Sequence, residues 1–153
     1  MRVLVIGCGN PDRGDDAAGI LVVRRLRERG VCVREHSGDG LALIDVWSQA
    51  EYVILIDTIV TGAVPGTISG FLGAEAVLVR SASTSSHSFD VASAIELARA
   101  LDRLPGALKI YGIEGCAFEL GTQPQTAVLD AVERVAKLVL AEVQRLEPAE
   151  PEQ

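Results

Sequence analysis

Short apolar runs alternate along this chain with amphipathic segments. Apolar or alternating segments of strand length occur over residues 3–6, 31–34, 52–56, 67–72 and 108–113. Apolar residues recur at helical spacing over residues 15–29, 42–48, 88–104 and 122–146. Strands that alternate with helices predict an α/β fold, in which a mostly parallel sheet carries helices on both faces. Crossover connections of this kind bring every strand-to-helix turn to one edge of the sheet, where ligands bind.

Local signals mark the ends of several of these helices. Gly30 follows the first amphipathic segment and is a typical helix stop, and Asp39 is a candidate N-cap for the second. The last helix is predicted to open at Thr122, because Gln125 completes a capping-box pattern and Pro124 lies in the first turn. The apolar stripe of that helix comprises Val128, Val132, Val135, Leu138, Val139 and Val143.

Length and charge narrow the class of protein. The 153 residues suit one domain, which we place at residues 1–146, and the Glu- and Pro-rich tail at residues 147–153 is predicted to be disordered. The net charge of −7 argues against nucleic-acid and membrane contacts, and no apolar run approaches the ~20 residues of a membrane span. Three widely spaced cysteines and a start without a signal-peptide pattern indicate a cytoplasmic protein. Without a coiled-coil signal, we expect a monomer.

The first predicted strand ends in a glycine-rich loop that carries carboxylates. The loop resembles the start of a dinucleotide-binding fingerprint, but Asp12 occupies the position of the third glycine. Asp15 and Asp16 would repel a pyrophosphate at the helix N-terminus, and Glu35 is poorly placed as the acid that binds a ribose. Nucleotide binding is therefore disfavoured.

Three polar residues are predicted to share the carboxyl edge of the sheet. Asp16 lies in the first turn after the first strand, Asp57 directly follows the strand at 52–56, and His87 lies in a polar loop ahead of the third helix. Two carboxylates and an imidazole can bind a divalent transition metal and leave coordination positions open. Each residue also has a structural explanation, as a helix cap, a turn residue or a surface histidine. The metal hypothesis therefore depends on the convergence of all three.

Nucleophilic chemistry is the alternative interpretation. Cys8 or Cys116 could pair with His87 as a thiolate and its base, although buried cysteines are more often packing residues. A Ser-His-Asp arrangement could use Ser86 or Ser88, but the chain has no G-x-S-x-G elbow to support it.

Four segments of this chain together resemble the hydrogenase maturation protease family. They are GCGNPDRGDDAAG at residues 7–19, ILID at 54–57, SSHSFD at 85–90 and YGIEGCAFELG at 111–121. The resemblance covers nearly the whole chain, from Met1 to about Leu146. It implies a three-layer α/β/α sandwich of the phosphorylase/hydrolase-like kind, around a twisted, mostly parallel sheet. It also implies an endopeptidase that removes the C-terminal extension of the large-subunit precursor of a nickel–iron hydrogenase.

The resemblance also assigns roles to residues. The metal-contacting residues of the family fall on Asp16, Asp57 and His87, the three positions that the predicted topology selects. In the family, cleavage follows the loading of nickel into the precursor, so the nickel is expected to come with the substrate. One departure is HSGDGLAL at residues 36–43, where many members have D-G-G-T, so Asp39 is an uncertain counterpart of the acidic residue there. His36 is a second candidate ligand, although a solvated position at a strand end is favoured.

The mechanism that we expect is metal-assisted hydrolysis. Nickel held by the cysteines of the precursor would dock onto Asp16, Asp57 and His87, and would polarise the nearby peptide bond or supply the attacking water. Asp15 would stabilise the glycine loop or orient a ligand. Two alternatives remain: a non-catalytic, metal-dependent chaperone of the precursor, and a cysteine peptidase of related fold that uses Cys116 and His87.

Overall fold

The computed structural model describes residues 2–48, 50–72 and 91–148 of the chain. The strands are β1 (Val3–Cys8), β2 (Val33–His36), β3 (Tyr52–Ile59), β4 (Ile68–Leu72) and β5 (Ala107–Glu114). The helices are the 3-10 turn η1 (Gly14–Ala17), α1 (Ala18–Arg27), α2 (Gly40–Trp47), α3 (Val91–Ala100) and α4 (Thr126–Leu146).

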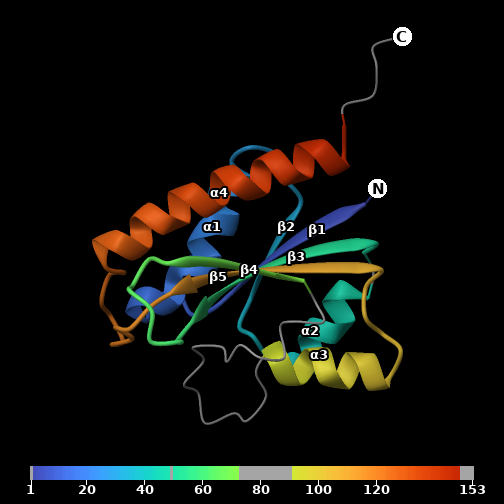
Figure 1. Ribbon diagram of the computed structural model, residues 1–153, viewed down its shortest axis with the longest axis horizontal. Helices are drawn as coiled ribbons and strands as arrows, with labels where there is room; N and C mark the ends of the chain where they lie inside the picture. Colours follow the sequence, from blue (N-terminus) through green and yellow to red (C-terminus); the bar gives the residue numbers. More distant parts are fainter. Residues whose placement is uncertain (1, 49, 73–90, 149–153) are drawn as a thin grey trace.

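The strands form one sheet in the order β2-β1-β3-β5-β4. β1, β2, β3 and β5 run parallel, and β4 pairs antiparallel with β5 at the edge of the sheet. Helices α1 and α4 cover one face, and α2 and α3 cover the other (Figure 1). The predicted α/β class and mostly parallel sheet are confirmed. The loops that follow β1, β3 and β5 gather at the left in Figure 1, opposite the N-terminus.

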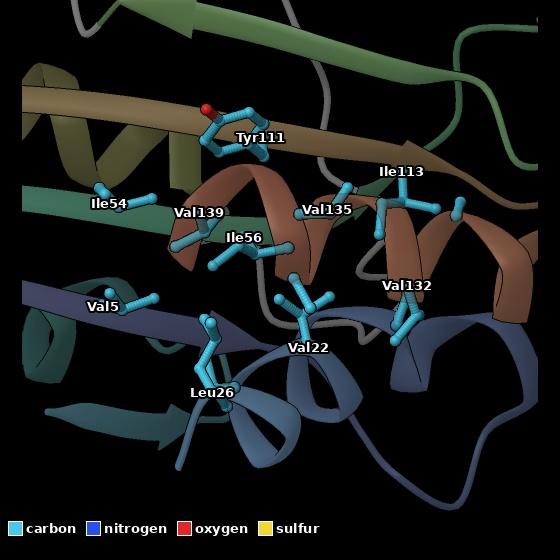
Figure 2. Packing of buried hydrophobic residues seen from close by; sticks show 14 of the residues in the cluster. Val5, Val22, Leu26, Ile54, Ile56, Tyr111, Ile113, Val132, Val135 and Val139 are labelled. Carbon is cyan, nitrogen blue, oxygen red and sulfur yellow. The ribbon is translucent and has the colours of Figure 1, made fainter. Parts of the chain in front are cut away.

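The core consists of two apolar layers on either side of the sheet. Ile54 and Ile56 of β3 face α1 and α4, whereas Val53 and Leu55 face α2 and α3, as alternation along a strand requires. Figure 2 shows the first layer, in which α4 contributes Val132, Val135 and Val139 and α1 contributes Val22 and Leu26. The predicted stripe of α4 is buried except at Leu138, which is half exposed. The second layer includes Ile6, Leu43, Trp47 and Ile95.

The boundaries of β2 and of α3 differ from the prediction, and the start of β2 differs because a neighbouring residue is used for a helix end. β2 begins at Val33 and not at residue 31, since Val31 still closes α1: its N–H donates to the carbonyl of Leu26. Gly30 adopts a φ of 79° at this point, which is the left-handed conformation of a helix stop. The helix predicted to reach residue 104 ends at Ala100, and residues 88–90 of that prediction lie outside the described residues.

The predicted capping box of the last helix is wrong. α4 begins at Thr126, four residues later than expected, and its N-cap Gln125 makes no side-chain capping bond. The Gln125 amide donates instead to the carboxylate of Asp15, at 2.6 Å. The Thr122 hydroxyl donates to the carbonyl of Glu119. By contrast, Asp39 caps α2 as predicted, accepting a bond from the N–H of Leu41.

The described chain continues two residues past α4. Glu147 accepts a hydrogen bond from the N–H of Val3 at 2.7 Å, so the first residue of the predicted tail is tied to the start of β1. Residues 149–153, the rest of that tail, lie outside the described residues.

Candidate functional site

Two buried aspartates lie at the carboxyl edge of the sheet. Asp16 belongs to the 3-10 turn η1 that follows β1, and it is 6% exposed. Asp57 is 5% exposed and lies inside β3, which continues to Ile59 and so does not end before the aspartate as predicted. Since Val53 and Leu55 face α2 and α3, the alternation of β3 places Asp57 on the same face. The N–H of Thr58 donates to Oδ1 of Asp57 at 2.8 Å.

The carboxylate of Asp16 is poorly solvated. Its Oδ2 accepts the N–H of Asn10 at 3.1 Å, whereas its buried Oδ1 has no hydrogen-bond partner among the described residues. Burial raises the pKa of Asp16 to about 6, and the Asn10 bond and the charge of Arg13 only partly oppose this shift. A carboxylate in this state favours either a proton or a bound cation.

Cys8, the last residue of β1, is influenced by the charges of both aspartates. Its thiol is buried, and it packs in the apolar layer on the α2 and α3 side of the sheet. Burial raises the pKa of Cys8 well above its ordinary value, and the charges of Asp57 and Asp16 raise it further. The charges of both carboxylates thus act on Cys8, and the pairing of Gly7 with Ile56 sets Cys8 beside Asp57, so Asp16 and Asp57 lie at the same edge of the sheet. A thiol with a raised pKa is a poor nucleophile, which favours the packing role of Cys8.

Asp15 has the opposite environment to its neighbour. It is fully buried, and three N–H donors of the backbone and the amide of Gln125 surround its carboxylate. Burial works against the charge, yet hydrogen bonds from Cys116, Gln125 and Ala117 hold the pKa of Asp15 below its ordinary value. The hydrogen bonds of Asp15 thus favour its charged form, whereas the charge of Asp16 is only partly compensated. A pair of acids whose pKa values diverge in this way is typical of functional sites.

The glycine loop serves close packing of the backbone. A Cβ on Gly9, whose φ is 143°, would lie 2.0 Å from the carbonyl oxygen of Asp16. A Cβ on Gly19 would lie 2.4 Å from the carbonyl oxygen of Cys8 and 2.5 Å from that of Ile56. Both glycines let η1 and the start of α1 approach β1 and β3 at the site. The loop therefore places the Asp16 turn against the strand ends.

Another buried carboxylate at this edge is engaged by the chain itself. Glu114, at the end of β5, is 2% exposed. It accepts the N–H of Thr61 at 2.7 Å, the Thr61 hydroxyl at 2.9 Å and the N–H of Gly62 at 3.0 Å. These bonds fasten the loop between β3 and β4, which explains the buried charge without a ligand.

His87, the third predicted ligand, lies outside the described residues, as do Ser86, Ser88 and the predicted polar loop at 81–86. Across the described ranges, no three His, Cys, Asp or Glu side chains form a group that could hold a metal ion. The donor set that the structure brings together is thus the carboxylate pair. It suits a divalent cation, because two negative charges and an unpartnered oxygen are present at one buried place.

Other residues considered for chemistry have structural roles. Glu35 forms ion pairs with Arg24 and Arg27, each at 2.8 Å, which leaves no support for a ribose contact. Nδ1 of His36 accepts the N–H of Gly38 at 2.9 Å, so that nitrogen helps to close the loop after β2. All three cysteines are free, as predicted. Cys116 is exposed and its sulfur accepts the Gln125 amide at 3.2 Å.

The sequence pattern does not predict the contacts of Asp15. Its carboxylate accepts bonds from the backbone after β5 and from Gln125, which the pattern places in a capping box, and its carbonyl accepts the Thr58 hydroxyl at 2.9 Å. The signal in the sequence is the adjacent pair of acids after a glycine loop. Neighbouring side chains on a helical turn point in different directions, so the two acids must meet different surroundings. Among the described helices, none combines the length and the hydropathy of a membrane-spanning segment.

Comparisons with known proteins agree with this geometry. The chain matches the family model of the hydrogenase maturation proteases over residues 21–142. It is 29% identical over 131 residues to protein FrxA of Pyrococcus furiosus, which covers 84% of this chain and 95% of that protein. It is 25% identical over 149 residues to the hydrogenase 2 maturation protease of Escherichia coli, with coverage of 92% and 90%. Among solved structures, it resembles the NiFe hydrogenase maturation protease HybD from Thermococcus kodakarensis, with a TM-score of 0.75, 26% identity and coverage of 93% and 99%.

Proposed function

Because this chain belongs to the hydrogenase maturation protease family, we propose that it removes the C-terminal extension from the precursor of a nickel–iron hydrogenase large subunit. The chain is a peptidase by family, and the identity of its substrate is the proposal. The observation that carries it is the buried Asp16 carboxylate, whose Oδ1 has no partner within the described part of the chain, at the same edge of the sheet as the buried Asp57. Such a site suits a substrate that brings its own cation.

We propose that the cation is the nickel of the loaded precursor and that Asp16, Asp57 and His87 contact it. The two carboxylates neutralise a 2+ charge, which lowers the cost of bringing the ion to a buried edge. A divalent cation at this place polarises the carbonyl of a neighbouring peptide bond. Dependence on a loaded precursor follows, since a precursor without nickel offers the acidic pair no partner.

The test is a processing assay on nickel-loaded and nickel-free precursor, read by mass spectrometry of the intact precursor. We expect shortening only of the loaded form. His87→Ala should abolish shortening, because it removes a proposed contact to the cation. The matched control is His36→Ala, which removes the other histidine of the chain. His36 ends β2, which β1 separates from β3 and Asp57, and its Nδ1 accepts the N–H of Gly38. That variant should process the precursor at a rate close to wild type.

The same assay separates the alternatives. Binding of the loaded precursor without shortening would indicate a chaperone and would contradict the proposed activity. Inactivation by alkylation of Cys116, reproduced by loss of activity in Cys116→Ser, would instead favour a cysteine peptidase. Normal processing by His87→Ala would refute the proposed contact with the cation.

We also propose that the protein acts in the cytoplasm as a monomer. Three cysteines without a disulfide support a reducing compartment, and the net charge of −7 suits an unassociated acidic protein.

A further inference from the structure

The carboxylate of Asp15 accepts four hydrogen bonds from other described residues. Oδ2 accepts the N–H of Cys116 at 2.9 Å, the N–H of Ala117 at 3.0 Å and the side-chain amide of Gln125 at 2.6 Å. Oδ1 accepts the backbone N–H of Gln125 at 2.9 Å. The residue is 0% exposed, so these bonds replace water completely. A buried carboxylate with three donors to one oxygen and one donor to the other is strongly held in one orientation.

The backbone of Asp15 extends this network to the strand that carries Asp57. Its N–H donates to the carbonyl of Ala117 at 2.9 Å, and its carbonyl accepts the hydroxyl of Thr58 at 2.9 Å. Thr58 directly follows Asp57, and Asp16 directly follows Asp15. One residue is therefore bonded to the loop after β5, to the start of α4 and to the end of β3. Both aspartates of the candidate site are next in sequence to a residue of this network.

The packing around Asp15 leaves little room for adjustment. A Cβ on Gly115 would lie 2.8 Å from the Cβ of Asp15, and a Cβ on Gly14 would lie 2.4 Å from the carbonyl oxygen of Ala117. Backbone thus approaches Asp15 closely from two sides. The loop after β5 is thus packed closely against η1, the turn that carries Asp16.

We infer that Asp15 is a positioning residue that fixes the separation and orientation of Asp16 and Asp57. The inference rests on the proposed function, because it concerns the same site. It explains why the position holds a carboxylate: an amide in its place would set its NH₂ group against a backbone N–H in either orientation. With the amide nitrogen at Oδ1 it would face the N–H of Gln125, and at Oδ2 it would face those of Cys116 and Ala117.

The test compares Asp15→Asn with Asp12→Asn, which removes the same charge from the same loop. Asp12 is exposed, and its hydrogen bonds to other described residues use its backbone N–H and carbonyl. We measure kcat and KM for loaded precursor, and the Kd of the chain for Ni²⁺ alone by calorimetry. Asp15→Asn should lower kcat by about 10- to 100-fold with a smaller change in KM, and should weaken Ni²⁺ binding by a similar factor. Asp12→Asn should change neither quantity by more than about twofold.

A second variant keeps the inference testable if Asp15→Asn does not fold. Gln125→Ala removes a single side-chain donor to Asp15 and leaves its three backbone donors in place. It should fold and show an intermediate fall in kcat and in Ni²⁺ affinity at a temperature well below its Tm. Wild-type kcat and Ni²⁺ affinity in a folded Asp15→Asn, or in Gln125→Ala when only that variant folds, would overturn the positioning role. Failure of the wild-type chain to cleave loaded precursor would instead overturn the proposed function, and the positioning role with it.

Discussion

At the scale of single residues, the pair Asp15 and Asp16 shows how surroundings divide two identical side chains. Asp15 meets three backbone donors and an amide, and its pKa is held low. Asp16 meets one donor to Oδ2 and none to Oδ1 among the described residues, and burial raises its pKa to about 6. The charged form of Asp15 stabilises the folded state, whereas ionisation of Asp16 lowers the stability of the folded state. A cation would remove that destabilisation.

This difference predicts a pH dependence for Asp16. The carboxyl ionises near 3.8 in the unfolded chain and near 6 in the folded chain, so the folded state binds more protons between these values. The free energy of unfolding should therefore fall as pH rises from about 4 to about 7, by up to about 3 kcal/mol. Asp16→Asn carries no charge at any pH and should lack this component. Urea unfolding of both proteins at several pH values, in the presence of a chelator, measures the difference.

The control for this prediction is Asp45→Asn, which removes an exposed carboxylate of α2 that pairs with Arg103 on the surface. The Asp45 variant should follow the wild-type curve within about 1 kcal/mol. Parallel curves for wild type and Asp16→Asn would show that burial does not raise the pKa of Asp16. Added Ni²⁺ should stabilise wild type above pH 6 and leave Asp16→Asn little changed.

At the scale of elements, the site depends on how closely α1 approaches the sheet. Gly7 and Gly19 form the contact: a Cβ on Gly7 would lie 2.2 Å from the carbonyl oxygen of Gly19. The approach brings η1, and with it Asp16, against the ends of β1 and β3. A glycine in the first turn of a helix costs some helix stability, and here the close packing explains its presence.

Gly19→Ala should therefore damage both stability and activity. Its Cβ would meet the backbone carbonyls of Cys8 and Ile56 at 2.4 and 2.5 Å, so α1 must move away from the sheet. We expect a loss of about 2 kcal/mol or more in the free energy of unfolding, in spite of the better helix propensity of alanine. Precursor processing should fall even at temperatures where the variant is folded, because Asp16 moves with the helix.

Gly70→Ala is the matched control for that change. Gly70 lies in β4 with nothing within 4 Å of an added Cβ, so the methyl group has space. Thermal unfolding should place this variant within about 0.5 kcal/mol of wild type. A Gly19→Ala protein as stable as Gly70→Ala would contradict the close packing of α1 on β1 and β3.

In the molecule as a whole, a hydrogen-bond network around Glu142 and the candidate site with Asp16 and Asp57 lie at opposite ends of the sheet. Glu142, near the end of α4, accepts the hydroxyl of Tyr52 at 2.9 Å and that of Tyr111 at 2.7 Å. Lys109 lies 3.5 Å from the same carboxylate. These groups join α4 to the start of β3 and to β5, at the right in Figure 1, away from the loops that carry the candidate site. The network is satisfied internally and needs no ligand.

Substitution of Glu142 should therefore separate stability from activity. Glu142→Ala leaves the buried hydroxyl of Tyr111 and the part-buried hydroxyl of Tyr52 without their acceptor and should lower the free energy of unfolding by about 2 kcal/mol or more. Glu142→Gln should cost less, since its amide can accept from one hydroxyl and donate to the other. Both variants should process precursor at the wild-type rate at a temperature where they are folded. Denaturant unfolding and the mass-spectrometric assay give the two quantities.

A suitable control on the same helix is Glu133→Ala, which breaks only an exposed ion pair with Arg25. This change should cost less than about 1 kcal/mol. A loss of processing in folded Glu142→Ala would contradict the separation of the two ends of the sheet.

Sequence patterns predicted the strands and helices well because each has a period that burial imposes. The runs at residues 3–6, 52–56 and 108–113 became β1, β3 and β5, each extended by a few residues. The predicted boundaries are wrong where a residue bonds to a partner that the local pattern does not predict. Val31 bonds to the last turn of α1, so β2 starts later than predicted. The side chain of Gln125, which the pattern predicts to cap its own helix, donates to Asp15, over a hundred residues earlier in the chain. Local rules cannot anticipate a partner that distant.

The pattern of residues along the chain predicts the alternation of strands and helices, the mostly parallel sheet and the edge at which Asp16 and Asp57 lie. These properties follow from apolar periodicity and from the handedness of crossover connections, which are local and general. Which of the two adjacent acids has its hydrogen bonds satisfied depends on the folded chain. The difference between Asp15 and Asp16 depends on backbone donors at residues 116, 117 and 125, and the long-range packing of β5 and α4 brings these to the first turn. Charge in a protein interior is governed by such neighbours, and spacing along the chain does not record them.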